Sequence, residues 1–296
     1  MHRILALSLC ASCAAAAAWS GPLHAQGLTQ SASSAQQRLS RITIRSEGSG
    51  KPVVLIPGLA SPPSVFDEVA AKIGKDHRLI FVQVNGMASS PAGDAPLDNL
   101  IPGAVDELAG WLAANHIEKA AIVGHSMGGL MAMMLAKRHP ESAGKLLVVD
   151  SLPFYGMLFG PAATPDAIRP MVEQMRAALV SGKAPMQVPP HMSNSDAGKA
   201  KILTWLNSSD AKVVGEALVE DSTTDFRPDL AALSGLPITV LYAVPAPENK
   251  AMIEGLYSEA YKGLPAAKLV PVADSEHFIM LDQPHRFDEE VEAFLR

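Results

Sequence analysis

The feature that most constrains the fold is an alternation of two patterns along residues 41–296. Short runs of mostly β-branched and apolar residues are typical of strands that are buried on both faces of a sheet. They lie at 41–45, 52–56, 79–84, 120–123, 146–149, 238–242 and 268–272. Segments with an apolar stripe at helical spacing lie between them, at 65–73, 105–115, 130–138, 252–261 and 287–295. This order predicts an α/β fold with a mostly parallel central sheet and helices on both faces.

One long segment, residues 153–228, interrupts the alternation. It has no convincing strand pattern, and prolines punctuate it. Helical periodicity occurs at 168–179, 197–206 and 212–219. We expect a helical cap over the carboxyl edge of the sheet, where open α/β sheets bind ligands. The core then consists of residues 41–152 and 229–296.

The first 25 residues have the layout of a secretory signal peptide. A short positive end is followed by an apolar run rich in Ala and Leu, and Ala25 is a small residue suited to cleavage before Gln26. The run is shorter than the about 20 residues that span a bilayer, so no membrane span is expected in the mature chain; an uncleaved anchor is the alternative. Residues 26–40 are rich in Ser and Gln and predict a flexible lead-in. A periplasmic or secreted protein is expected.

Charge and cysteine content exclude several classes of function. The net charge of −6 argues against a nucleic-acid partner, which requires a basic surface. Cys10 and Cys13 both lie in the first 25 residues, so neither disulfides nor thiol chemistry are expected in the mature chain. Neither metal-ligand spacing nor a phosphate-binding loop is present in the sequence, so we expect no metal and no cofactor.

The segment Gly124-His125-Ser126-Met127-Gly128-Gly129 matches the pattern G-x-S-x-G. A β-type run ends directly before Gly124, and a helix-period run starts directly after Gly129. Strand, sharp turn and helix is the arrangement that a nucleophile elbow requires. The glycines allow strand and helix to approach closely around a strained serine. Ser126 is therefore the predicted nucleophile.

His277 is the predicted general base. It follows the last strand, precedes the last helix and comes after Ser126 in the chain, which places it on a loop at the same sheet edge. The other histidines fit this role less well. His125 flanks the nucleophile, His139 ends a helix, His191 lies in the cap and His285 lies in the first turn of the last helix.

With these motifs the chain resembles the α/β-hydrolase superfamily over residues 41–296. The resemblance rests on Pro57-Gly58-Leu59-Ala60 after an early strand, on the GHSMGG turn, and on Ser275-Glu276-His277-Phe278 after the last strand. It implies an α/β-hydrolase fold, a Ser-His-acid triad, and an oxyanion hole made by the backbone N–H groups of Leu59 and Met127.

The acid of such a triad stays open at this point. The superfamily usually places an Asp after the penultimate strand, but residues 242–249 contain no Asp and no Gly. Asp150 is the favoured substitute, because it closes the strand after the elbow helix, where haloalkane dehalogenase-like members carry their acid. Asp150 as a simple turn residue beside Ser151 is the alternative. Glu248 is the second candidate, followed by Asp225 or no acid.

A serine activated by histidine predicts acyl transfer, in which an acyl-enzyme forms and water then hydrolyses it. We expect a carboxylic-ester hydrolase for a small-molecule acyl or ester substrate, such as a lipase or lactonase. Cap side chains such as Tyr155, Met171 and Met175 are candidates for the substrate pocket. A non-hydrolytic enzyme on the same scaffold (acyltransferase, C–C lyase or haloperoxidase) and a catalytically silent binding protein are the alternatives. The sequence does not decide the oligomeric state.

Overall fold

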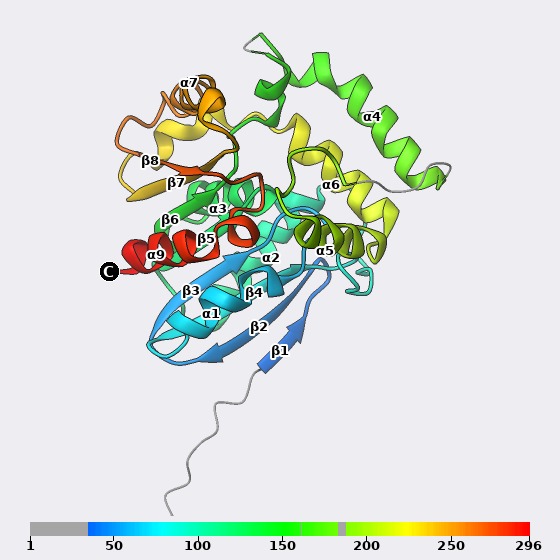
Figure 1. Ribbon diagram of the computed structural model, residues 1–296. Helices are drawn as coiled ribbons and strands as arrows, with labels where there is room; N and C mark the ends of the chain where they lie inside the picture. Colours follow the sequence, from blue (N-terminus) through cyan, green and yellow to red (C-terminus); the bar gives the residue numbers. More distant parts are fainter. Residues whose placement is uncertain (1–34, 161, 183–187) are drawn as a thin grey trace, which may run out of the picture. The chain divides into compact units, whose positions relative to one another are not determined.

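The computed structural model describes residues 35–160, 162–182 and 188–296, and an eight-stranded sheet lies at its centre (Figure 1). The strand order is β1-β2-β4-β3-β5-β6-β7-β8. β2 pairs antiparallel with β1 and β4, and every pair from β4 to β8 is parallel, which confirms the predicted sheet. The strands are β1 (Ala35–Arg38), β2 (Ile42–Gly48), β3 (Lys51–Ile56), β4 (His77–Val84), β5 (Ala120–His125), β6 (Ala143–Val149), β7 (Ile238–Val244) and β8 (Lys268–Ala273).

Helices cover both faces of this sheet. One face carries α1 (Asp67–Ile73), α8 (Ile279–Asp282) and α9 (Pro284–Leu295), and the other carries α2 (Leu100–Ala114), α3 (Met127–Arg138) and α7 (Lys250–Ala260). Because side chains alternate along a strand, Val53 and Leu55 of β3 join the core of the first face, and Val54 and Ile56 join that of the second. Burial on both faces explains why the strand sequences are almost continuously apolar.

The predicted helical cap is present between β6 and β7. It contains α4 (Pro165–Ser181), α5 (Asp196–Asn207) and α6 (Ala211–Thr223), preceded by the 3-10 turn η2 (Tyr155–Phe159) and followed by η3 (Arg227–Leu233). Each helix begins after an N-cap side chain that accepts backbone N–H groups, namely Thr164, Ser195 and Asp210. With these N-cap residues, each helix extends beyond the periodic segment that the sequence predicts. The domain limits at 153 and 228 stay predictions.

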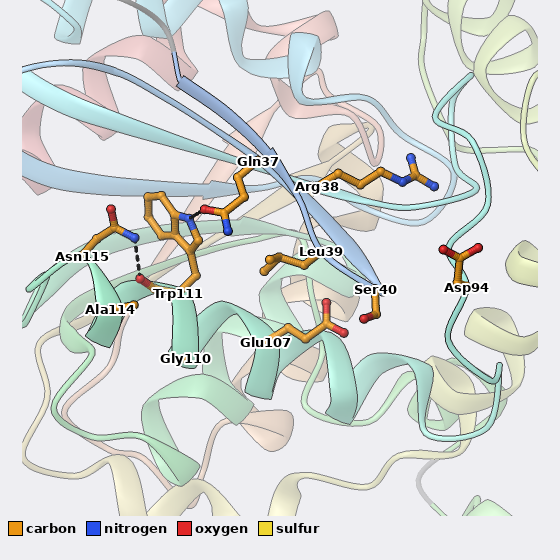
Figure 2. A pocket seen from close by; sticks show the side chains of 10 residues that line it. All are labelled: Gln37, Arg38, Leu39, Ser40, Asp94, Glu107, Gly110, Trp111, Ala114 and Asn115. Carbon is orange, nitrogen blue, oxygen red and sulfur yellow. Dashed lines mark hydrogen bonds between the residues drawn. The ribbon is translucent and has the colours of Figure 1, made fainter.

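The N-terminal edge of the sheet differs from expectation. Residues 26–40 were expected to form a flexible lead-in, but Ala35–Arg38 form β1 and pair with β2. Backbone hydrogen bonds hold this polar edge strand, and Trp111 Nε1 donates to Gln37 Oε1 at 2.9 Å, so its sequence needs no apolar pattern. A pocket of about 650 Å³ lies between β1 and α2 and contains none of the predicted catalytic residues. Figure 2 shows the side chains that line it. The signal peptide predicted at 1–25 lies outside the described residues.

Within the described ranges, no helix combines the length and the apolar character that a membrane span needs.

Candidate active site

Ser126 occupies the sharp turn between β5 and α3. Its backbone lies at φ 55° and ψ −125°, a conformation that costs energy for a residue with a Cβ. The turn is held by a hydrogen bond from the Ser126 N–H to the carbonyl of Val149 (2.9 Å) and one from the Gly129 N–H to the carbonyl of Ser126 (2.7 Å). The strand–turn–helix arrangement predicted for Ser126 is therefore present, and it presents a half-buried serine at the carboxyl edge of the sheet.

Close backbone packing around this turn explains two of its glycines. A Cβ on Gly124 would lie 2.2 Å from the carbonyl oxygen of Gly128, and a Cβ on Gly128 would lie 2.1 Å from the carbonyl oxygen of Ile56. Both neighbours are backbone atoms that cannot rotate away. The elbow therefore requires glycine at both positions.

Gly128→Ala is expected to lower the free energy of unfolding by about 2–4 kcal/mol, because β3 must move away from α3 to admit the methyl group. Urea unfolding measures the loss. Gly110→Ala is the matched control: Gly110 is exposed on α2, and a Cβ there would meet no described atom within 4 Å outside its own stretch of helix. This change should therefore stabilise by up to about 1 kcal/mol. Equal unfolding midpoints for the two variants would contradict the packing argument.

His277 and Asp150 meet at the carboxyl ends of the strands. His277 lies between β8 and α8, Asp150 follows β6, and His277 Nδ1 is 2.7 Å from Asp150 Oδ2. Asp150 Oδ1 also accepts hydrogen bonds from the Ala243 N–H and the Tyr257 hydroxyl, each at 2.9 Å. An ionised carboxylate only accepts, so Nδ1 of a neutral His277 carries the proton and Nε2 is free to accept another.

The surroundings of Asp150 keep it ionised. Burial by itself raises the pKa of this carboxyl, but the hydrogen bond and charge of His277 and the donors Ala243 N–H and Tyr257 hydroxyl outweigh it and lower the pKa below 3.8. A negative Asp150 fixes the imidazole ring and favours its protonated form during a reaction.

The rival acids lie elsewhere. Glu248 is an exposed residue of the short 3-10 turn η4 (Pro247–Asn249), and among the described residues it has neither a hydrogen bond nor an ion pair. Asp225 accepts two hydrogen bonds from the Arg227 guanidinium, at 2.6 and 2.8 Å. Neither contacts His277 in the structure.

The other histidines lie in surroundings that differ from those of His277. His139 pairs with Asp106 at 2.9 Å and His191 with Glu276 at 3.2 Å, while His285 is exposed on α9. His125 is fully buried, and burial lowers its pKa to about 3, so its ring is neutral. Its Nε2 lies 3.0 Å from the carbonyl oxygen of His277, and the two rings are 4.7 Å apart. His125, the residue directly before Ser126, thus links the His277 loop to the elbow.

Ser126 Oγ itself has no hydrogen-bond partner among the described residues, so it does not bond to His277 Nε2 in this structure. Such catalytic hydrogen bonds are often long without substrate and tighten in the complex. The loop after β3 lies directly against the serine, since a Cβ on Gly58 would be 2.9 Å from Ser126 Cβ. Two backbone N–H groups are close to this serine: that of Leu59, which follows Gly58, and that of Met127, which starts α3. Neither donates a hydrogen bond to another described residue.

Two residues near this site were missed by sequence reasoning. Tyr257 is separated from Asp150 by 107 positions, and nothing in the helical stripe of 252–261 indicates that its hydroxyl reaches a carboxylate. Asp221 lies on α6 and interacts electrostatically with His277. The sequence indicates the position of Asp221 in one way only. It follows the buried residues Val214 and Ala217 by seven and four positions, so it continues their stripe along the helix.

A profile of the alpha/beta hydrolase family matches residues 53–290. The chain is 31% identical to the esterase YbfF of Escherichia coli (strain K12) over 111 residues, which are 38% of this chain and 42% of the esterase. The chain thus spans about two fifths of the length of the curated relatives that it matches first.

Similar solved structures cover most of the chain. The enol-lactonase from Burkholderia xenovorans LB400 matches with a TM-score of 0.68 and 20% identity, over 86% of this chain and 96% of that chain. A thermophilic esterase from Thermogutta terrifontis matches with a TM-score of 0.70 and 20% identity, over 88% and 98%. At this level of identity the likeness shows the shared fold.

Proposed function

Because the chain belongs to the alpha/beta hydrolase family, we propose that it is a serine hydrolase that cleaves carboxylic ester bonds of small molecules through an acyl-enzyme intermediate. The observation that carries this proposal is the 2.7 Å contact between His277 Nδ1 and Asp150 Oδ2 beside the elbow serine. The resemblance to proteins named as esterases and as an enol-lactonase supports ester bonds as the target.

In the proposed reaction, Ser126 Oγ attacks the ester carbonyl carbon while His277 Nε2 takes the hydroxyl proton. The N–H groups of Leu59 and Met127 donate to the oxyanion that forms on the carbonyl oxygen, and the amino end of α3 favours the same negative charge. The intermediate collapses when the C–O bond to the alcohol breaks and His277 donates the proton to that alcohol. Water then attacks the acyl-serine with His277 as base, and the carboxylic acid and the free serine are released.

Labelling with a fluorophosphonate probe tests whether Ser126 is an activated nucleophile. We expect stoichiometric labelling of the folded protein at Ser126, no labelling of Ser126→Ala, and no labelling after denaturation, because only the assembled site activates the hydroxyl. An unlabelled folded protein would favour a silent binding protein over the proposed enzyme. Labelling without turnover of a chain-length series of nitrophenyl esters would favour a non-hydrolytic acyl-transfer reaction.

We also propose that the protein is exported to the periplasm or secreted. The pattern of residues 1–25 supports this proposal. Mass spectrometry of the protein from its native cells is expected to give an N-terminus at Gln26, and a cytoplasmic protein that retains Met1 would contradict it.

A further inference from the structure

Both backbone groups of His277 are held by other parts of the chain. Its carbonyl oxygen lies 3.0 Å from His125 Nε2 in the elbow, and its N–H donates to the carbonyl of His191 at 3.1 Å. The next N–H, that of Phe278, donates to the carbonyl of Met192 at 2.9 Å. Both accepting carbonyls belong to the cap, in the segment directly before α5. The loop that carries the candidate base is therefore docked on the cap as well as on the elbow.

The carboxylate of Asp282 joins the same cap segment to the same loop. This residue ends α8, and it is partly buried. Its Oδ2 accepts the N–H of Glu276, the residue directly before His277, at 2.9 Å. Its Oδ1 accepts the hydroxyl of Ser193 at 2.6 Å, and the two oxygens share the N–H of Asn194 at 3.2 and 3.1 Å. One side chain thus connects the loop with the two cap residues that follow the accepting carbonyls.

Apolar packing accompanies this tie between cap and loop but does not fix its register. The ring of Phe278 is buried and lies 5.9 Å from that of Trp205 on α5. Such contacts are non-directional, whereas hydrogen bonds to a carboxylate are directional and about twice as strong as those between neutral groups. Ser193 is only 2% exposed, so water competes little for its bond to Asp282. The carboxylate is therefore the group that sets how the cap segment and the loop fit together.

We propose that Asp282 is a positioning residue for His277, which it holds in place through the cap segment 191–194. The proposal rests on the proposed function, since it takes His277 as the base of that reaction. A displacement of about 1 Å in a catalytic group can cost about 100-fold in rate. Release of the cap segment from the loop would free the His277 N–H and allow such a displacement relative to Ser126. A tie that only stabilised the fold would leave the folded enzyme fully active.

The kinetics of Asp282→Asn in the full chain test the effect on the reaction. The NH₂ group of the variant would face a donor that the carboxylate accepts, so at least one of the two segments is released. We expect kcat for nitrophenyl esters to fall by about 10- to 100-fold and KM to change by less than about threefold, because the base acts after the substrate is bound. Gln283→Ala is the matched control. It removes a 2.8 Å bond from the neighbouring residue to the carbonyl of Asp274, which does not involve the cap, and should keep kcat within about twofold.

Amide hydrogen exchange tests the position of the loop without turnover. In Asp282→Asn, the N–H groups of His277 and Phe278 should exchange at least about tenfold faster than in the unchanged protein, because the cap carbonyls that accept them are no longer held. The N–H of Ser126, which donates to the carbonyl of Val149, should exchange at an unchanged rate. An unchanged rate there shows that the elbow stays folded in the variant.

Ser193→Ala is a milder second variant, which keeps the proposal testable if Asp282→Asn does not fold. It removes one donor and leaves the N–H groups of Asn194 and Glu276 on the carboxylate. We expect kcat to fall by about three- to tenfold. Added to Asp282→Asn, the change should cost less than a further twofold or so, because the carboxylate that the hydroxyl binds is already gone. Losses that multiply in the double variant would show that the two residues act independently, and would overturn the tie.

The outcomes separate this proposal from the proposed function. A folded Asp282→Asn protein that hydrolyses esters with kcat within about twofold of the unchanged protein would overturn the positioning role and leave the serine hydrolase intact. Unchanged exchange at His277 and Phe278 would overturn it as well, even if kcat fell. Faster exchange at these amides in a protein that neither reacts with the fluorophosphonate nor hydrolyses esters would retain the tie between cap and loop and refute the serine hydrolase.

Discussion

Ser126→Ala is expected to lower kcat for ester hydrolysis by at least about 10⁴-fold, because it removes the atom that forms the acyl-enzyme. The oxyanion donors and the binding pocket stay in place, so a small residual activity above the uncatalysed rate is expected. KM should change much less than kcat, since the hydroxyl contributes mainly after the substrate is bound. Steady-state kinetics with nitrophenyl esters measure both quantities.

The variant should fold normally, which makes its kinetics informative. Ala has the same Cβ as Ser, so the strained backbone at φ 55° is neither relieved nor worsened, and Ser126 Oγ has no partner to lose among the described residues. Ser234→Ala, an exposed position after η3, is the control and should keep its activity within about twofold. A kcat of Ser126→Ala within tenfold of the unchanged protein would refute Ser126 as the nucleophile.

The parts of the fold that the sequence predicts are those in which burial determines the residue pattern. The strands from β2 to β8 and the cap helices are visible because one or both faces exclude polar side chains. The strand β1 is not, since Gln36, Gln37 and Arg38 are exposed and their pairing uses backbone groups that nearly every residue has.

The residues of the candidate site differ in the same way in how far the sequence predicts them. Ser126 and His277 are predictable as candidates for nucleophile and base because the order of elements around a strand end indicates them. Asp150 remained one of several candidates because its position depends on the neighbouring strand: β6 pairs with β7 with Val149 opposite Leu241. This register places Asp150 where it accepts the N–H of Ala243 beyond that pair. Sheet register and the contact with Tyr257 depend on residues about a hundred positions away in the chain.

Asp150→Asn is expected to lower kcat by about 10³–10⁴-fold with little loss of structure. The amide oxygen of the variant can still accept from the Ala243 N–H and the Tyr257 hydroxyl. Its NH₂ group then faces His277 Nδ1 and donates to it, which moves the imidazole proton to Nε2. In that tautomer His277 cannot take the proton of Ser126, and the negative charge that stabilises the imidazolium is lost as well.

Glu248→Gln is the matched comparison, because it removes the charge of the rival acid at the exposed turn η4 and should leave kcat within about twofold. The low pKa of Asp150 adds a second readout. A carboxyl group whose pKa is lower in the folded protein stabilises the fold at pH values above its unfolded pKa of about 4. This contribution is lost as the pH falls through the lower pKa of the folded state. The stability difference between the Asn variant and the unchanged protein should therefore shrink below about pH 4. Full activity in Asp150→Asn together with a large loss in Glu248→Gln would assign the acid to Glu248, because the residue that orients His277 is the one whose charge the reaction cannot lose.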